Sequence, residues 1–252
     1  MAIRAAGTYV SKNKGAKRGK AKGKENRFSK NKFYNLTSRL FPITNHGTTS
    51  HPKMRSKQDL TPFLVGRTFS VNQGDLECAD PMNAVNSPRY FKFKVNAVCG
   101  NNCNSVFNGM EVSREKITGM IRKWHTLIEA NIPITTKDGS TWRVFVNAVT
   151  KKKNPDSLKH YAKASEIKII RKRIVETTLE HLDGIEVEKL VKVLSTEGLA
   201  KEFETRCNEI YPIFAMIIKV KPIKNMQCII VKTRSDDPAH LESDNKSDLE
   251  NE

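Results

Sequence analysis

The sequence lacks the motifs by which most enzymes can be recognised. It contains no glycine-rich phosphate-binding loop of either common type, and it has no H-E-x-x-H, no G-x-S-x-G and no zinc-deaminase pattern. Its six histidines are scattered along the chain. We therefore predict no catalytic residues, no cofactor and no small-molecule substrate.

Long apolar runs are also missing. The longest covers the six residues 213–218, whereas a membrane-spanning helix needs roughly 18 apolar residues. We expect a buried strand there and no membrane partner. The basic N-terminus is not followed by an apolar stretch, so we expect no secretory signal. Five cysteines at irregular spacing indicate reduced thiols in the cytosol or nucleus.

Two of these cysteines have a spacing that half of a zinc site could use. Cys99 and Cys103 flank Gly100 and two asparagines. A structural zinc ion needs four ligands, and no second cysteine pair or clustered histidine pair follows. The alternative is a turn at a strand end between two half-buried thiols. We favour the turn and predict no metal site.

Positive charge is what the sequence has in excess. It contains 44 Lys and Arg against 27 Asp and Glu, a net charge of +17. Such a balance favours a polyanionic partner, with nucleic acid the first candidate and an acidic membrane surface the second.

Charge also divides the chain into three predicted parts. Residues 1–32 hold eleven basic residues and one acid, with few large apolar residues, and we predict a disordered, RNA-binding tail. Residues 235–252 hold seven acids and one lysine and are predicted to be a disordered acidic tail. Residues 33–234 are predicted to be the folded core domain, in which 33–63 is irregular and extended.

Hydrophobic periodicity within the core predicts both strands and helices. Alternating apolar and polar residues indicate strands at 66–71, at 90–98 and in a hairpin at 134–149 that turns at Asp138-Gly139. Two more strands are predicted at 213–223 and 226–231. Helices are predicted at 113–130, 161–182, 185–196 and 199–209. The fold class is α+β: a curved, mainly antiparallel, barrel-like sheet packed with about four helices.

The first predicted helix has an apolar stripe and a basic face. At about 100° per residue, six apolar residues share an arc of roughly 120°. They are Ile117, Met120, Ile121, Trp124, Leu127 and Ile128. We therefore predict that Trp124 packs in the core and does not stack on a base. Arg122 would point away from the stripe, and His125 would be packed or solvated at its edge. Ser113 is the expected N-cap.

The second predicted helix has a stripe of Ile167, Ile170, Ile174 and Thr178. Arg171 falls inside the arc of this stripe, where it must extend to solvent, pair with an acid or contact an anion. Acids are sparse between residues 150 and 175. A solvated charge run is the usual interpretation of such a helix, but a solvated face would more often alternate charges, so contact with an anionic partner stays open beside it.

Several segments resemble landmarks of a known family in the same order. They are FNGMEVSREKITGMIRKWHTLIEA at 107–130 and the segments 66–77, 136–152, 161–172 and 210–224. Together they are similar to the S-three-a/S-one-e family of small-subunit ribosomal proteins, of the archaeal–eukaryotic type. The resemblance covers roughly residues 10–225. Residues 46–63, those before Lys12 and those after 234 depart from the family pattern.

The resemblance implies a structural constituent of the cytosolic small ribosomal subunit. The family has an α+β core with a barrel-like sheet, lacks catalytic residues and required metals, and lies on the platform near the mRNA exit. The expected partners are the 3′ region of small-subunit rRNA, neighbouring ribosomal proteins and mRNA near the exit. We expect a cytoplasmic ribosomal location with nucleolar or nuclear passage during assembly.

Carried onto this chain, the resemblance and the charge pattern give a set of candidate RNA-binding cations. They are Lys12, Lys14, Lys17, Arg18, Lys20, Lys22, Lys24, Arg27, Lys30, Lys32, Arg122, Lys123, Lys151, Lys152, Lys153, Lys168, Arg171, Lys172 and Arg173. Two alternatives stay open: an RNA-processing or RNA-modifying enzyme that uses the same surface, and a free nucleic-acid-binding regulator. A pocket of converging ionisable groups with shifted pKa values would favour the enzyme.

Overall fold

The computed structural model describes residues 31–52, 60–77, 87–153 and 156–224. The predicted strand at 226–231, the acidic tail and the basic tail up to Lys30 lie outside these residues. In chain order the elements are β1 (Asn31–Thr37), β2 (Asn45–Pro52), α1 (Thr61–Leu64), β3 (Thr68–Asn72), α2 (Gln73–Glu77), β4 (Arg89–Cys99), β5 (Asn102–Val112), α3 (Arg114–Met120), β6 (Leu127–Thr135), β7 (Thr141–Thr150), α4 (Ala164–Leu182), α5 (Val187–Ser195), α6 (Gly198–Cys207) and β8 (Ile213–Lys224).

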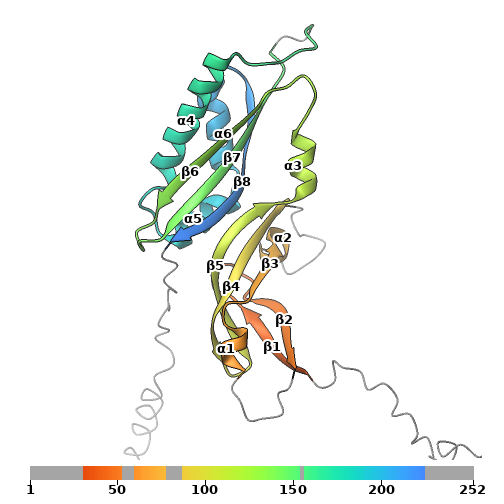
Figure 1. Ribbon diagram of the computed structural model, residues 1–252, viewed down its shortest axis with the longest axis vertical. Coiled ribbons are helices and arrows are strands. Elements are labelled where there is room, and N and C mark those ends of the chain that lie inside the picture. The colour runs from red at the N-terminus through yellow and green to blue at the C-terminus, as the bar shows by residue number, and fades with distance from the viewer. Residues whose placement is uncertain (1–30, 53–59, 78–86, 154–155, 225–252) are drawn as a thin grey trace, which may run out of the picture.

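The strands form one elongated, open sheet (Figure 1). Its main path runs β2-β1-β5-β8-β7-β6, and β4 pairs with the other side of β5 and with β3. Most pairs are antiparallel, and β1 runs parallel to β5. The α+β class and the antiparallel pairing are confirmed. The barrel-like sheet is wrong, because β2 and β6 end the path at opposite edges and do not pair within the described chain.

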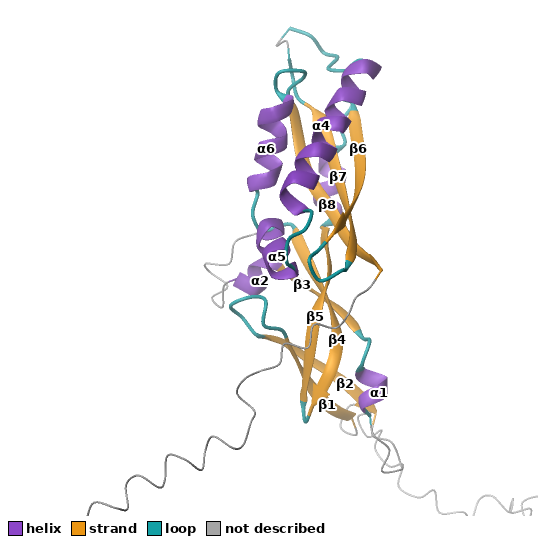
Figure 2. Ribbon diagram, turned by 90° about the vertical axis from the view of Figure 1, so that its left-hand side faces the viewer, coloured by secondary structure: helices purple, strands orange, loops and turns teal. Residues whose placement is uncertain are grey.

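A layer of helices covers one face of β6, β7 and β8 (Figure 2). The predicted stripe of the long helix is confirmed in α4, where Ile170, Ile174 and Thr178 are buried and Ile167 is half-buried. The helices predicted at 185–196 and 199–209 are α5 and α6. With the short α1 and α2, which were not predicted, the described chain has six helices. None of these described helices is long and apolar enough to cross a membrane.

The opposite face of the sheet has a smaller apolar cluster beneath α3. Met120 packs there with residues of three strands, including Val149, Met216 and Ile218. Strand β8 is thus buried on both faces, because Ala215 and Ile217 point into the larger core under α4–α6. This explains the continuous apolar run at 213–218 and confirms the buried strand predicted there.

The other end of the molecule is built from β1 to β5. Phe91, Phe93 and Val95 are buried as the alternation predicts, but Ala97 is exposed, because the β4–β5 register shifts between Val95 and Ala97. The predicted turn between β4 and β5 is confirmed, although Cys103 is fully buried.

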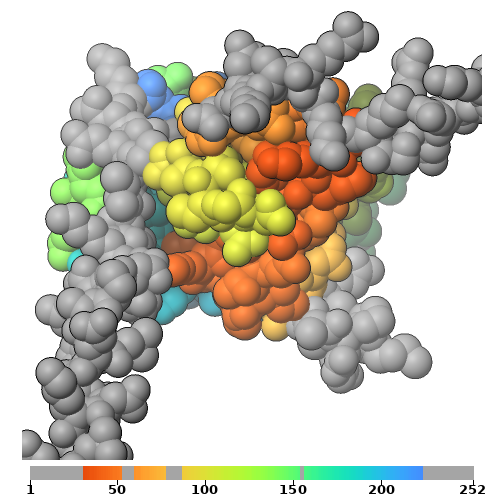
Figure 3. All heavy atoms as spheres, turned by 90° about the horizontal axis from the view of Figure 1, so that it is seen from below, coloured from red at the N-terminus to blue at the C-terminus, as the bar shows by residue number. Residues whose placement is uncertain are grey.

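Residues 33–63 are not irregular throughout. They contain most of the antiparallel β1–β2 hairpin, in which Tyr34 and Leu36 pack in a small apolar cluster with Leu64 and Val95. Figure 3 shows this end, with the yellow β4–β5 turn beside the red and orange residues of β1 and β2.

The helix predicted at 113–130 is wrong in its length. Ser113 is the N-cap as predicted, its side chain accepting a hydrogen bond from the Lys116 backbone N–H (3.4 Å), but α3 ends at Met120. From Leu127 the chain is a strand, which pairs with β7 over nine residue pairs. Ile128 belongs to both the helical stripe and the alternating series of β6, and pairing with β7 decides between them.

One short junction joins the two ends of the sheet. Strand β5 pairs with β8 through Met110 opposite Val220 and Glu111 opposite Lys219. Gly109 lies beside this junction with φ +126°, and a Cβ atom there would be only 2.4 Å from the Val220 carbonyl oxygen. Glycine is required because only it tolerates both this backbone conformation and the close approach of β8.

We predict that Gly109→Ala lowers the free energy of unfolding by about 3 kcal/mol, because it adds a backbone clash to a strained φ. Gly66→Ala is the matched control, since Gly66 also has a positive φ (+88°) but open space around it. The free energy of unfolding of that control variant should fall by only about 1 kcal/mol. Urea unfolding measures both variants, and equal losses would show that β8 does not approach Gly109 closely.

Candidate nucleic-acid interface

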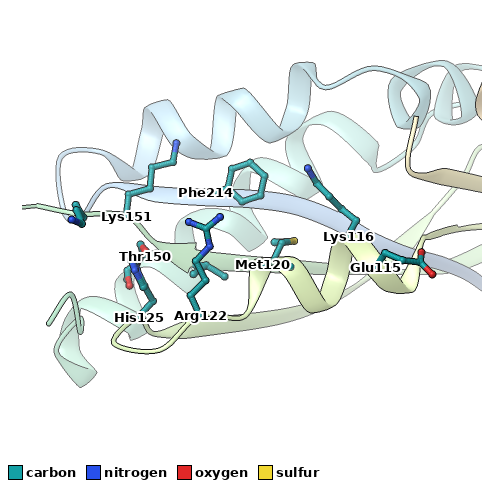
Figure 4. Close-up of a pocket in the computed structure, with 11 residues that line it drawn as sticks. Glu115, Lys116, Met120, Arg122, His125, Thr150, Lys151 and Phe214 are labelled. Atoms are coloured by element: carbon teal, nitrogen blue, oxygen red, sulfur yellow. Dashed lines mark hydrogen bonds between the residues drawn. The ribbon is translucent and has the colours of Figure 1, made fainter. Parts of the chain in front are cut away.

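A hollow of about 640 Å³ lies between α3 and the adjoining ends of β7 and β8 (Figure 4). Its lining comes from α3, from the loop 121–126, from the end of β7 and from the start of β8. The lining residues are Glu115, Lys116, Gly119, Met120, Arg122, His125, Val149, Thr150, Lys151, Lys152 and Phe214. Four of the lining side chains are cations: Lys116 of α3, Arg122 of the loop, and Lys151 and Lys152, which directly follow β7.

An aromatic ring lies among these cations. The Lys116 and Lys151 ammonium groups are 5.8 and 5.7 Å from the centre of the Phe214 ring. Figure 4 shows Arg122 pointing into the same space, toward Phe214 and Lys151. A ring that attracts cations holds the two ammonium groups beside the guanidinium despite their mutual repulsion.

Most of this charge is not neutralised within the described chain. Lys151 forms an ion pair with Glu204 of α6 (2.7 Å). No acidic side chain of the described residues pairs with Lys116, Arg122 or Lys152. The hollow therefore presents unpaired cations to solvent, as expected of a surface that binds anions.

The loop that holds Arg122 is fixed by hydrogen bonds to the segment before α4. The His160 backbone N–H donates to the Trp124 carbonyl (2.8 Å), and the Thr150 hydroxyl donates to the His160 carbonyl (2.7 Å). The Thr126 backbone N–H donates to the Thr150 hydroxyl (2.9 Å), and His125 Nδ1 bonds the Thr150 carbonyl. The loop is therefore positioned before any ligand arrives.

His160 lies buried beneath this loop. Burial lowers its pKa, and the nearby charges of His125 and Lys152 lower it further. Its Nε2 atom has no hydrogen-bond partner among the described residues. A buried, neutral imidazole of this kind supports the loop and is not placed to exchange protons with a substrate.

Trp124 does not occupy the core position that was predicted. Trp124 is 48% exposed, and the other tryptophan, Trp142, is buried at 2% exposure and stacks on Phe107. Trp124 also has φ +66°, which makes it the one non-glycine residue with positive φ among those described. The Lys159 ammonium group lies 5.8 Å from the centre of its ring. The prediction failed because α3 ends before residue 124.

The predicted cations are only partly brought together. Arg122, Lys151 and Lys152 line the hollow, whereas Lys123 and Lys153 are exposed but lie outside its lining. Lys32 is exposed on β1, at the other end of the molecule. The nine candidates from Lys12 to Lys30 fall outside the described residues.

The cations of α4 are distributed differently from the prediction. Lys172 pairs with Glu176, and Arg173 pairs with Glu209, which follows α6. Arg171 is exposed, and its Nε donates to the Glu129 carbonyl of β6 (3.1 Å). Lys168 is exposed on the same helix. Glu176 on the same helix and the distant Glu209 thus neutralise part of a face that looked uniformly basic.

Sequence reasoning missed three residues of this region. Lys116 and Phe214 line the hollow, and Lys159 lies against Trp124. Only Lys116 had a usable signal, because it falls in the same predicted helix as Arg122.

Comparison with known proteins identifies the family to which this arrangement belongs. The model of the ribosomal S3Ae family matches residues 19–226. The chain belongs to the ribosomal S3Ae family. A curated relative from Encephalitozoon cuniculi (strain GB-M1), the small ribosomal subunit protein eS1, is 39% identical over 233 residues, which cover 90% of this chain and 94% of the relative. The family resemblance seen in the sequence is therefore confirmed. As an S3Ae-family member, the chain is a structural constituent of the ribosome.

We predict that the backbone of this S3Ae-family chain at residue 124 favours glycine over any L-residue. Trp124→Gly should be more stable than Trp124→Ala by about 1 kcal/mol, because only glycine accepts a left-handed φ without strain. The same pair of substitutions at Lys123, which is exposed and does not have positive φ, should give the opposite order. Thermal and urea unfolding of the four variants measure this, and alanine matching glycine at residue 124 would contradict the left-handed conformation.

Proposed function

We propose that this structural constituent of the small ribosomal subunit binds small-subunit rRNA through the basic hollow, supporting subunit assembly and translation. The observation that favours this surface is the set of unpaired cations, Lys116, Arg122 and Lys152, that line the same hollow as Phe214. Lysine and arginine neutralise phosphates and release the counterions condensed on RNA, and this effect supplies most sequence-independent affinity. Such contacts set the position of the protein on RNA without reading its sequence.

Finer features of the family role are also part of this proposal. We place the protein on the platform near the mRNA exit, with neighbouring ribosomal proteins and mRNA as further partners. The basic segment 1–32 is proposed to be an RNA-binding tail of the core 33–234, and 235–252 to be an acidic tail. The protein would act in the cytoplasmic ribosome and pass through the nucleolus or nucleus during assembly.

The hollow gives little support to the alternative of an RNA-modifying enzyme. The ionisable groups of its lining are cations, His125 and the single carboxylate Glu115. His160, whose pKa is shifted, lies buried beneath the loop and does not line the hollow. Membership of a family of structural ribosomal proteins likewise favours a role without catalysis. A free regulator would differ in cells, because it would remain outside ribosomal subunits.

We predict that the double variant Arg122→Glu, Lys152→Glu binds an rRNA fragment with a weaker salt dependence. Each lost phosphate contact should flatten the slope of log affinity against log salt by about one unit, so the double variant should lose about two. Lys192→Glu with Lys201→Glu is the matched control, because these exposed lysines of α5 and α6 change the net charge equally and lie outside the hollow.

Filter binding at several salt concentrations measures these slopes, and sedimentation of cell lysates shows whether each variant enters small subunits. The control should match the wild type in both measurements. If the salt slopes of the two double variants flatten equally, net charge and not the hollow determines binding. Wild-type protein that stays at the top of the gradient would support the free regulator instead.

The basic tail should contribute a separate electrostatic term. Residues 1–30 precede β1 and contain ten lysines and arginines. If about half of them contact phosphate, deleting 1–30 should flatten the salt slope by roughly four units without changing sequence preference. Replacing the ten residues by glutamine in the full-length chain is the matched control for length. An unchanged slope in both would exclude the tail from RNA binding.

A further inference from the structure

Trp124 has a conformation and an exposure that the phosphate contacts do not explain. Trp124 is 48% exposed, although burial of a large apolar side chain is favourable. Its φ of +66° is strained for any residue with a Cβ atom. Strained residues that the surrounding hydrogen bonds hold in place are concentrated at functional sites. Here the His160 backbone N–H holds the Trp124 carbonyl at 2.8 Å.

We propose that Trp124 is a stacking platform for an unpaired nucleobase of RNA. This inference rests on the proposed function, because it needs the neighbouring cations to bind the backbone of the same strand. Arg122 and His125, on either side of Trp124 in the sequence, both line the hollow. A strand whose phosphates lie in the hollow therefore passes close to the indole.

The surroundings of the indole match the way in which proteins bind single-stranded nucleic acids. Such sites combine a basic groove that follows the backbone with aromatic side chains on which bases stack. Here the Lys159 ammonium group lies 5.8 Å from the centre of the Trp124 ring. Lys123, the preceding residue, is exposed, and the exposed Lys152 lines the hollow. Any base offers a π-face, so the platform would accept an unpaired base of any identity.

A protein partner is the other candidate for this surface. Leu158 and Tyr161, in the segment that leads to α4, are 81% and 55% exposed. Charged residues are depleted in the centre of protein–protein interfaces, whereas Trp124 is accompanied by Lys123 and Lys159. The charges therefore favour RNA over a protein, and protein contact is left as an outcome of the test.

The two tryptophans of the chain make the test specific. Trp142 is buried in the core, so a stacked base can reach only Trp124. We would titrate the full-length protein with an oligoadenylate of about ten nucleotides and follow tryptophan fluorescence. The control ligand is an abasic phosphodiester of equal length, which has the same charge and no bases. The oligoadenylate should quench the exposed tryptophan, and the abasic strand should leave its emission unchanged.

Variants then separate stacking from charge. Trp124→Ala should weaken oligoadenylate binding by about tenfold and leave abasic binding unchanged, since a single base–aromatic stack is lost. Trp124→Phe should retain most of the affinity. If Trp124→Ala loses the same affinity for both ligands, the platform is overturned. The platform alone is also overturned if binding depends on Arg122 and Lys152 but does not quench the fluorescence. Binding that depends on neither cation would overturn the proposed function of the hollow.

The unpaired base could belong to rRNA or to mRNA, and intact subunits distinguish the two. Ultraviolet crosslinking of purified small subunits, with and without bound mRNA, locates the partner of the peptide that contains Trp124. A crosslink present in both samples identifies rRNA, and one that requires mRNA identifies mRNA. Both results support the platform. A crosslink to a neighbouring protein instead of RNA would overturn it.

Discussion

The contact between β5 and β8 is the constraint on which the rest of the structure depends. Within the sheet it consists of two residue pairs that join the end built from β1 to β5 to the helix-covered end, and the larger apolar core is continuous across the same junction. Glu111 of β5 lies between Lys92 of β4 and Lys219 of β8, and chiefly its hydrogen bond to Lys92 lowers the pKa of its carboxyl group. Helix α3 begins directly after β5, so the same contact sets where α3 lies against the sheet and hence the width of the basic hollow.

Much of the fold could be predicted from periodicity, and the failures have physical causes. Strand β7 and helix α4 each bury one regular face, so local pattern and tertiary packing agree. Around residues 121–130 they disagree, because Ile128 completes both a helical stripe and a strand alternation. Only the pairing of β6 with β7 resolves this. The open sheet was beyond prediction as well, since closure depends on which edges meet in space.

The candidate site could be predicted where cations are close together in the sequence. It could not be predicted where acids from other parts of the chain neutralise those cations in the folded structure. Arg122, Lys151 and Lys152 stood out as cations and do line the hollow. On α4 the acid that balances Arg173 is Glu209, which follows α6 and is too distant in sequence for a local window to reveal. Phe214 was hidden within an apolar run, and the exposure of Trp124 followed from the early end of α3.

The strand order has a consequence for how the protein is made. Strand β8 is the last described element in sequence, yet it lies in the middle of the sheet between β5 and β7. During synthesis the edges of both neighbours therefore stay unpaired until β8, at residues 213–224, has left the ribosome that makes the chain. Open edges invite pairing with other chains, and late, long-range pairing slows folding. A chain with this topology needs its edges shielded until β8 arrives, so a molecular chaperone that covers β5 and β7 during translation would benefit it.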